Sequence, residues 1–504
     1  MIERILYKIK FFFIKKLSFF STGFLKNASQ LISGTVMAQL IVILTAPIIT
    51  RVYSPEDLGF LAIFVAMVSI IGSLSTFRYE IAIPLVKSHM ESSSLLILTI
   101  IVNIVYTATC AFLLYSYSKP LLLFLNAEIL INYLWTVPLG IFVGGLYKSF
   151  TYWALKEESF SNIAKTRMQQ SYGMVFAQVV MGFLNFGAFG LIFGYVLGFF
   201  SGLARLVYFW FITGLRFVPT IKAKNITSVA KEHKNLPLFS NWGALVNVIG
   251  LQLPVIMFAS LFSPYLAGLY MLAQRVANAP VQLVAESVGK AFYISSIKQE
   301  RRKQLLPLVE VVFKILLRIS ILPFLLLSLV APGLFSLIFG SEWLEAGFYL
   351  QIMAIWLLSS FIFVPLMTLF ATLDKHREDL IFQFFLVALR IIGIYIGAIL
   401  ESPLIAIGLF SILSAATYYT FGSWLINKAG LSFYYQIKII FSELRFPILV
   451  FLIIFLIQFY FFNLQSSLAN FSELLIYLII CILVTAYYFF KSKKLFMKLK
   501  IFSE

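Results

Sequence analysis

Arginines inside long apolar stretches are the residues of this sequence best placed to do chemistry. Arg318 and Arg390 lie about 15 to 18 Å from the starts of their stretches at 1.5 Å per helical residue, and Arg275 is comparably deep. A charge at the bilayer centre costs roughly 2.5 to 3.5 kcal/mol, so each arginine needs a partner or a cavity. The planar guanidinium fork suits phosphate oxygens. These positions therefore predict a buried site for a phosphate or pyrophosphate group.

Further polar residues accompany these arginines inside the apolar stretches. Arg78 and Arg205 lie nearer the stretch ends and are weaker candidates for the same anion. Glu286 is the most deeply placed carboxylate and is the candidate for binding a coupling ion or proton. At 100° per residue, one helical stripe would carry Arg275, Asn278, Gln282, Glu286 and Lys290. The amides predicted to line a polar cavity are Gln39, Gln252, Asn278 and Gln282.

The composition indicates that the solvent of this chain is a bilayer. Its 504 residues are 61% hydrophobic and 12% charged, with a mean hydropathy of +0.95. The net charge of +18 is spread in short clusters between apolar runs, which indicates membrane topology and excludes a nucleic-acid partner. Cys110 and Cys481 lie in apolar stretches and the three His are scattered, so no disulfide framework, metal site or cofactor is expected.

A membrane span needs about 20 apolar residues, and we find about fourteen such windows. The expected spans are 31–50, 58–83, 94–116, 129–152, 168–186, 190–213, 238–260, 266–292, 308–331, 346–370, 378–400, 403–426, 447–463 and 472–490. The predicted domains are a cytoplasmic amphipathic segment 1–30, an N-lobe 31–213, a cytoplasmic linker 214–237, a C-lobe 238–426 and two extra helices with a basic tail, 427–504. The sequence therefore predicts an all-α membrane protein with two six-helix lobes.

The distribution of Lys and Arg among the loops predicts the orientation. With both termini in the cytoplasm, the outer loops contain only Arg51 and Lys119, whereas the inner loops are rich in Lys and Arg. The last two spans are expected to carry no buried charge, which leaves their role open. A short pattern also recurs, because Ser54-Pro55-x-x-x-Gly59 follows the first span and Ser263-Pro264-x-x-x-Gly268 follows the seventh. Its equal placement in both halves is typical of a duplicated six-helix repeat.

Several segments resemble the polysaccharide flippases of the multidrug/oligosaccharidyl-lipid/polysaccharide (MOP) exporter superfamily. The first two spans are similar in Leu31-Ile-Ser-Gly-Thr-Val-Met-Ala-Gln39, Tyr53-Ser-Pro-Glu-Asp-Leu-Gly59 and Phe77-Arg-Tyr-Glu-Ile-Ala-Ile-Pro84. Later matches are Ala267-Gly-Leu-Tyr270, Gln274-Arg-Val276 with Pro280, and Phe339-Gly-Ser-Glu-Trp343 with Ala346-Gly347. The resemblance covers about residues 25–426 and is to Wzx-type flippases.

This resemblance implies a transporter of the inner membrane and not an enzyme. Its substrate would be an undecaprenyl-pyrophosphate-linked oligosaccharide repeat unit for O-antigen, capsule or exopolysaccharide. Its partners would be the membrane lipid, a polysaccharide polymerase and a chain-length regulator. Three alternatives remain open: a lipid II flippase, a cation-coupled multidrug antiporter of the same superfamily, and a membrane polysaccharide polymerase. The antiporter would need a carboxylate in the core of its first or second span, whereas the polymerase would need a large outer loop.

Overall fold

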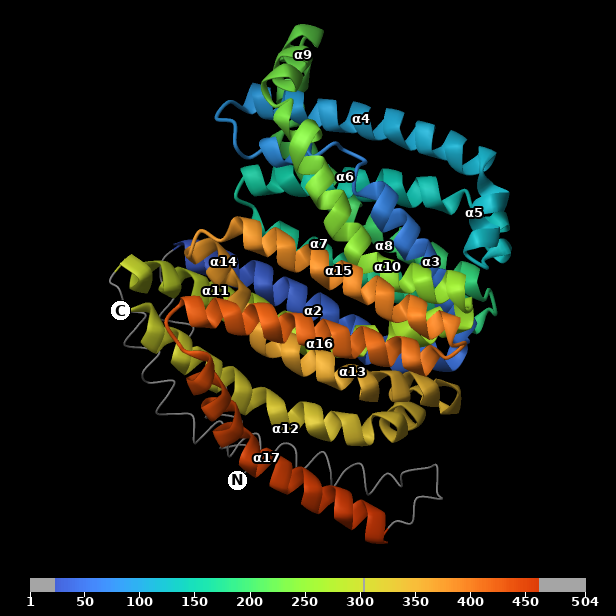
Figure 1. Cartoon of the computed structure of the whole chain (residues 1–504). Helices are drawn as coiled ribbons and strands as arrows, with labels where there is room; N and C mark the ends of the chain where they lie inside the picture. The colour runs from blue at the N-terminus through green and yellow to red at the C-terminus, as the bar shows by residue number, and fades with distance from the viewer. Residues whose placement is uncertain (1–22, 302–303, 462–504) are drawn as a thin grey trace, which may run out of the picture. The chain divides into compact units, whose positions relative to one another are not determined.

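The computed structural model describes residues 23–301 and 304–461, and over these residues the chain consists of helices and short turns without a strand (Figure 1). The prediction of an all-α membrane fold is confirmed. The N-terminal part of the predicted amphipathic segment and the predicted span 472–490 lie outside the described residues.

The helices follow the predicted windows closely. In the first half they are α2 (Gly23–Val52), α3 (Pro55–Gly72), η1 (Tyr79–Ala82), α4 (His89–Ser116), α5 (Ser118–Phe124), η2 (Glu128–Tyr133), α6 (Thr136–Lys156), α7 (Phe160–Phe183), α8 (Ala188–Thr213), η3 (Leu215–Thr220) and α9 (Ala223–Glu232). In the second half they are η4 (Leu236–Ser240), α10 (Asn241–Leu261), α11 (Pro264–Arg301), α12 (Leu305–Phe339), η5 (Ser341–Trp343), α13 (Leu344–Phe363), η6 (Pro365–Thr368), α14 (Leu369–Thr372), α15 (His376–Ile399), α16 (Pro403–Lys428) and α17 (Phe433–Phe461).

Among the described residues, nine helical segments are long and apolar enough to cross a membrane. They comprise most of α2, the whole of α3, α4, α8, α10, α12, α15 and α16, and the segment Ser341–Thr372. The predicted spans that remain in the described part fall on α6, α7, α11 and α17. About fourteen membrane helices therefore remain consistent with the structure.

The chain divides into two compact units. Among the described residues, the first contains 23–49, 64–122 and 128–249, and the second contains 50–63, 123–127, 250–301 and 304–461. Two short segments of the first half of the sequence thus pack with the second half. Each unit is considered separately below.

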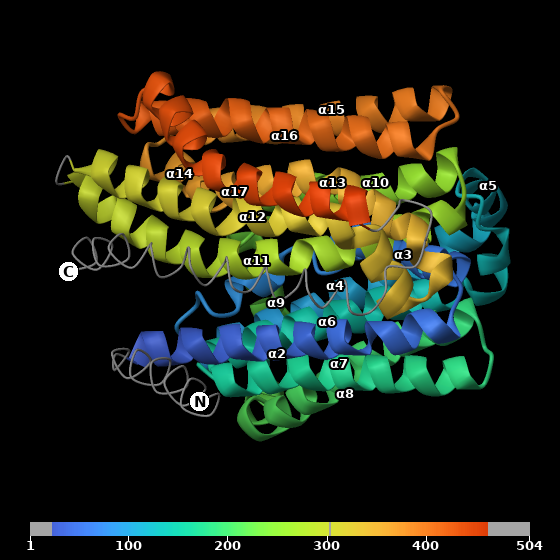
Figure 2. The same ribbon diagram turned by 90° about the horizontal axis from the view of Figure 1, so that it is seen from below.

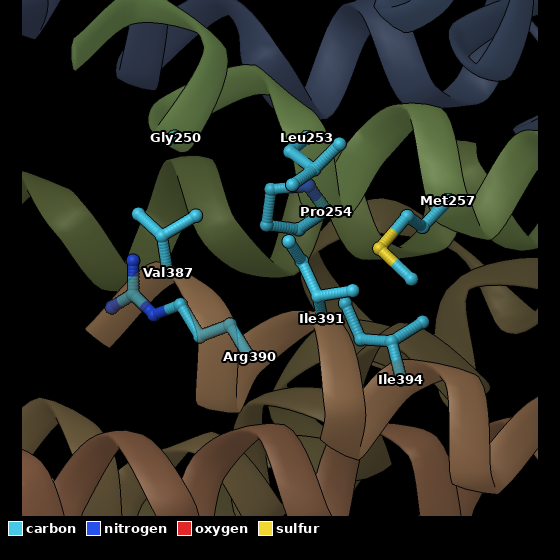
Figure 3. Close-up of a pocket in the computed structure, with 8 residues that line it drawn as sticks. All are labelled: Gly250, Leu253, Pro254, Met257, Val387, Arg390, Ile391 and Ile394. Carbon is cyan, nitrogen blue, oxygen red and sulfur yellow. The ribbon is translucent and has the colours of Figure 1, made fainter. Parts of the chain in front are cut away.

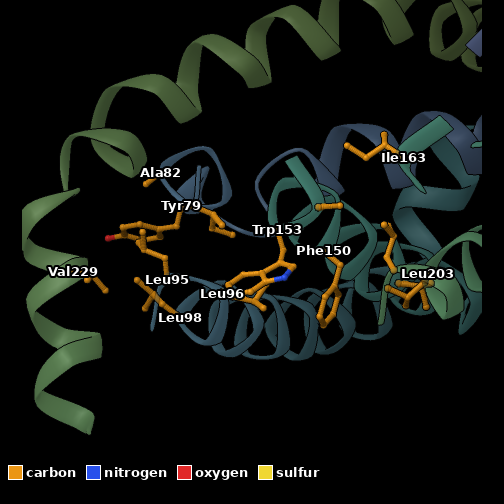
Figure 4. Close-up of a cluster of buried hydrophobic side chains, with 14 residues drawn as sticks. Tyr79, Ala82, Leu95, Leu96, Leu98, Phe150, Trp153, Ile163, Leu203 and Val229 are labelled. Carbon is orange, nitrogen blue, oxygen red and sulfur yellow. The ribbon is translucent and has the colours of Figure 1, made fainter. Parts of the chain in front are cut away.

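The core of the first unit forms around a fully buried tryptophan (Figure 4). Trp153 on α6 packs among Leu95, Leu96 and Phe150, and its indole N–H donates to the hydroxyl of Thr213 at 3.0 Å. Such a hydrogen bond lets a large ring be buried without leaving its polar atom unsatisfied. The cluster extends to Val229 on α9, so part of the sequence between the predicted lobes packs against this core.

In the second unit, the repeated Ser-Pro pattern starts two helices in the same way. The Ser54 hydroxyl accepts a hydrogen bond from the Asp57 N–H, and the Asp57 carboxylate accepts one from the Ser54 N–H, both at 3.1 Å. This is a capping box, with Pro55 at the first helical position. Ser263 likewise accepts from the Leu266 N–H at 3.3 Å, ahead of α11.

The glycines of the two patterns pack against each other's helix starts. A Cβ placed on Gly59 would lie 1.8 Å from the carbonyl oxygen of Pro264, and a Cβ on Gly268 would lie 1.8 Å from that of Pro55. Only a residue without a side chain fits at either position, because no Cβ approaches an oxygen so closely. The starts of α3 and α11 therefore cross at backbone contact, and the contact is reciprocal.

The expectation of one continuous span over 58–83 is wrong. The helix α3 ends at Gly72, and the chain then turns through Phe77 and Arg78, which have φ angles of 49° and 64°. Serine hydroxyls compete with the helix here, since Ser73 and Ser75 donate to the carbonyls of Ile70 and Gly72 at 2.7 and 2.8 Å. Arg78 and Glu80 consequently lie on a turn and a 3-10 helix.

For the first of the last two predicted helices, the expectation that it carries no buried charge is also wrong. The predicted window 447–463 belongs to α17, which already begins at Phe433. The longer helix includes Glu443, which is 8% exposed. The predicted window begins only at residue 447, because polar residues interrupt the apolar sequence in the first part of α17.

Candidate anion-binding sites

In the second unit, Arg390 on α15 lies in a cage of aromatic and hydroxyl side chains. Its guanidinium carbon lies 5.2 Å from the ring centroid of Trp356 and 5.0 Å from that of Phe410. Its Nε donates to the Ser414 hydroxyl at 2.9 Å, and the Tyr418 side chain is also hydrogen-bonded to it. Cation–π contacts of this kind contribute about 0.5 to 2 kcal/mol each and hold the arginine in one orientation.

A pocket opens beside this arginine between α10 and α15 (Figure 3). It is a shallow, open hollow with about 170 Å³ of empty space, and its lining is otherwise apolar. Its lining consists of Gly250, Leu253, Pro254, Met257, Val387, Arg390, Ile391 and Ile394. An apolar pocket with a single guanidinium at its edge suits a ligand that joins hydrocarbon to an anionic group.

Arg390 differs from Arg318, another deep arginine, in its ion pairing. In the part of the chain that the structure describes, no carboxylate forms an ion pair with Arg390, whereas Arg318 has one. The Arg390 side chain is only partly buried, so a ligand can still reach it. A half-exposed cation in an apolar helix lowers the cost of bringing an anion into the same place. Arg390 is therefore the strongest anion-binding candidate in the second unit.

The first unit contains a different cluster at the turn after α3. Glu80 is 5% exposed and accepts a hydrogen bond from the Thr76 hydroxyl at 2.6 Å. Lys148 on α6 donates to the Gly72 carbonyl at 2.9 Å and interacts electrostatically with Glu80 and Arg78. Two cations thus face one carboxylate. The Nε of Arg78 is buried and has no hydrogen-bond partner among the described residues.

This excess of positive charge makes the cluster a second anion-binding candidate. An unsatisfied buried guanidinium N–H costs free energy until an acceptor reaches it. A phosphate oxygen would supply that acceptor. Lys148 contacts the end of α3 at the Gly72 carbonyl, and the chain then turns through Phe77 and Arg78, which brings Arg78 into the same cluster.

We expect Thr76→Val to destabilise this cluster. The substitution keeps the side-chain shape but removes the hydrogen bond to the buried Glu80 carboxylate, which should cost about 1.5 to 3 kcal/mol. Thermal unfolding of the purified protein in detergent measures the change. Thr109→Val is the matched control, because the exposed Thr109 hydroxyl bonds only to the Val105 carbonyl of its own helix. Equal unfolding temperatures for both variants would contradict the prediction.

The other predicted arginines have different surroundings. Arg205 on α8 donates from Nε to the Asn162 side-chain oxygen on α7 at 3.2 Å, so an amide already occupies part of its fork. Arg318 on α12 is paired with Glu443. Arg275 is half-buried on α11. Glu310 and Lys314, four residues apart on α12, form an ion pair with each other.

The structure places the predicted polar lining on three helices. Gln39 is half-buried on α2, and Gln252 is half-buried on α10 without lining the pocket beside Arg390. Asn278 is half-buried and Gln282 exposed on α11. Glu286 also belongs to α11, but its side chain lies outside what the structure describes. The predicted stripe thus shares one helix, and its role as a cavity lining stays a prediction.

Sequence reasoning named no aromatic residue for the site, although Trp356 and Phe410 enclose Arg390. A signal was present on α16, where Phe410, Ser414 and Tyr418 recur every four residues and so share a face. No such sequence pattern pointed to Trp356 on α13, because only tertiary packing brings it next to Arg390.

The fold is that of the MOP-superfamily transporters. A lipid II flippase, MurJ, in an inward closed conformation superposes with a TM-score of 0.66 at 15% identity, over 93% of this chain and 99% of that chain. A multidrug resistance MATE family transporter in an inward-facing conformation gives 0.61 at 14% identity, over 78% and 94%. A mutant form of the Vibrio cholerae MATE transporter VcmN gives 0.51 at 15% identity, over 83% and 98%.

The chain belongs to the polysaccharide biosynthesis protein family, whose model matches residues 48–347, more than half of the chain. The family resemblance drawn from the sequence is therefore confirmed. No curated protein matches the chain significantly.

Proposed function

We propose that this protein is a flippase that moves an undecaprenyl-pyrophosphate-linked oligosaccharide across the inner membrane by alternating access. The match to the polysaccharide biosynthesis family over residues 48–347 carries the proposal. One of the similar solved structures is a lipid II flippase. A fold of this kind is therefore compatible with a lipid-linked substrate.

The basic residues suit the anionic part of this cargo. A pyrophosphate must be shielded from hydrocarbon throughout its passage, because an unpaired charge in an apolar medium is very costly. Arg390 beside its apolar pocket would contact the junction between phosphate and isoprenoid. Arg78 with Lys148 offers a second cationic position, and Arg205 and Arg275 are weaker candidates. Glu286 remains the candidate for ion coupling, with Gln39, Gln252, Asn278 and Gln282 as polar lining.

The proposed setting follows the distribution of charge in the sequence. Both termini would face the cytoplasm, and the loops with Arg51 and Lys119 would face outward. The lobes 31–213 and 238–426, the linker 214–237, the N-terminal segment 1–30 and the additional part 427–504 are proposed as functional divisions of the chain. A polysaccharide polymerase and a chain-length regulator are the proposed partners, with O-antigen, capsule or exopolysaccharide as the product.

Two alternatives use the same fold. A lipid II flippase would carry a peptidoglycan precursor through the same basic positions. A cation-coupled antiporter is less well supported, because α2 contains no acidic residue and Glu80, on the 3-10 helix that follows α3, already accepts a hydrogen bond from Thr76. A polysaccharide polymerase would be an enzyme, and the transporter fold does not favour it.

Deletion of the gene in its host, followed by mass spectrometry of lipid-linked oligosaccharides and surface glycan, tests the proposal. We expect undecaprenyl-linked repeat units to accumulate and surface polymer to disappear, with both restored by the gene in trans. Accumulation of lipid II would identify the first alternative. Unchanged glycan together with altered drug tolerance would reject the proposal in favour of the antiporter.

A further inference from the structure

A buried ion pair connects α12 to α17 within the second unit. Arg318 donates from Nε to one carboxylate oxygen of Glu443 at 2.6 Å and from Nη2 to the other at 2.7 Å. The two side chains are 17% and 9% exposed. Two parallel bonds between a guanidinium and a carboxylate are the strongest geometry this pair can adopt. The edge of the guanidinium formed by Nε and Nη2 is therefore already occupied by a carboxylate.

The same two helices continue to pack beyond the ion pair (Figures 1 and 2). Leu322 and Leu326 of α12 form a buried cluster with Ile454 of α17, and Val450 packs against it. The contact at Arg318 and Glu443 is followed by the contact of Leu326 with Ile454, later in the sequence of both helices. The two helices therefore run parallel. Gln436 fixes the start of α17, because its amide donates to the carbonyls of Ser423 and Leu431 at 3.0 and 2.8 Å.

We infer that Arg318 is the anchor of α17 and not a contact for the transported anion. Apolar side chains alone give a membrane helix little specificity, since lipid tails are as apolar as its neighbours. A single buried charge pair can select one register, because any slip would leave both charges unpaired in hydrocarbon. Arg318 and Glu443 would thus fix where α17 sits on α12. This role does not depend on which substrate the protein carries.

Charge reversal separates the two roles of Arg318. In a chain with Cys110→Ser and Cys481→Ser, the substitutions Leu326→Cys and Ile454→Cys report α12–α17 packing through oxidative cross-linking in membranes. We expect Arg318→Glu or Glu443→Arg alone to reduce the cross-linked fraction at least fivefold and to reduce surface glycan. The double reversal, Arg318→Glu with Glu443→Arg, should restore both to near the starting level.

Two results would overturn the inference. Restored cross-linking with glycan export still lost in the double reversal would show that Arg318 contacts the cargo. Unchanged cross-linking in either single variant would show that the pair does not position α17. The apolar pair Arg318→Met with Glu443→Leu removes the anchor without leaving a charge unpaired, so cross-linking should fall below the starting level but less than in either single reversal. Glu310→Gln is the matched control, because it breaks a pair within α12 alone and should change neither readout.

The cross-linking readout also keeps this inference distinct from the proposed function. If the protein carried another substrate, glycan export would not respond to any variant. Cross-linking would still fall in the single reversals and recover in the double reversal.

Discussion

Gly59→Ala and Gly268→Ala are each expected to abolish glycan export and to lower the stability of the protein. The added methyl group would lie 1.8 Å from a backbone carbonyl oxygen in both cases, so the starts of α3 and α11 must separate. Forcing extra volume into a packed contact typically costs about 1 to 3 kcal/mol, and a backbone atom cannot move aside as a flexible side chain can. Surface glycan in cells and thermal unfolding of the purified protein measure the two effects.

The reciprocal contact makes a sharper prediction for the double variant. Once one methyl group has separated the two helix starts, the second meets less resistance, so the double variant should lose less stability than the sum of the two single losses. Gly408→Ala on α16 is the matched control. A Cβ there meets nothing within 4 Å, and alanine is the better helix former by up to about 1 kcal/mol. Strictly additive losses would argue that the two glycines act at separate contacts.

Arg390→Ala is expected to reduce export about 10- to 100-fold, because one charge-assisted contact to the cargo contributes about 1.5 to 3 kcal/mol. Arg390→Lys should recover only part of that loss. The ammonium keeps the charge, but it lacks the planar group that lies over the rings of Trp356 and Phe410 and the Nε–H that reaches Ser414. The rate at which surface glycan reappears after induced expression measures these differences.

Arg377→Ala provides the control for Arg390 on the same helix, because Arg377 is exposed near the start of α15. Its export rate should match that of the unchanged protein. Protein amounts in the membrane must be equal across the series, since loss of the aromatic contacts could also lower stability. Normal export by Arg390→Ala at equal protein amount would remove Arg390 from the proposed cargo path.

The candidate site could be predicted only in part. The depth of Arg390 in an apolar stretch identified it, because a charge at that depth is costly whatever the fold. Nothing in the same argument distinguished Arg390 from Arg318. Both lie deep in apolar helices, and only packing shows that Glu443 satisfies one and that aromatic rings surround the other.

The sequence by itself determined the solvent, the helical fold class and the family. Apolar runs of about 20 residues must span a bilayer as helices, since no other open chain satisfies its backbone there. It also determined where α3 and α11 begin, because a serine cap followed by proline acts locally.

Tertiary structure decided which contacts the repeated glycines and the buried arginines make. The glycines 59 and 268 could be recognised as a repeated pattern, but their contact with each other depends on the meeting of helices that are far apart in the sequence. The pairing of Arg318 with Glu443 depends in the same way on a neighbour brought by folding. Local sequence fixes the capping and hydrophobicity of a helix, whereas the partner of a buried charge is chosen by how the helices pack.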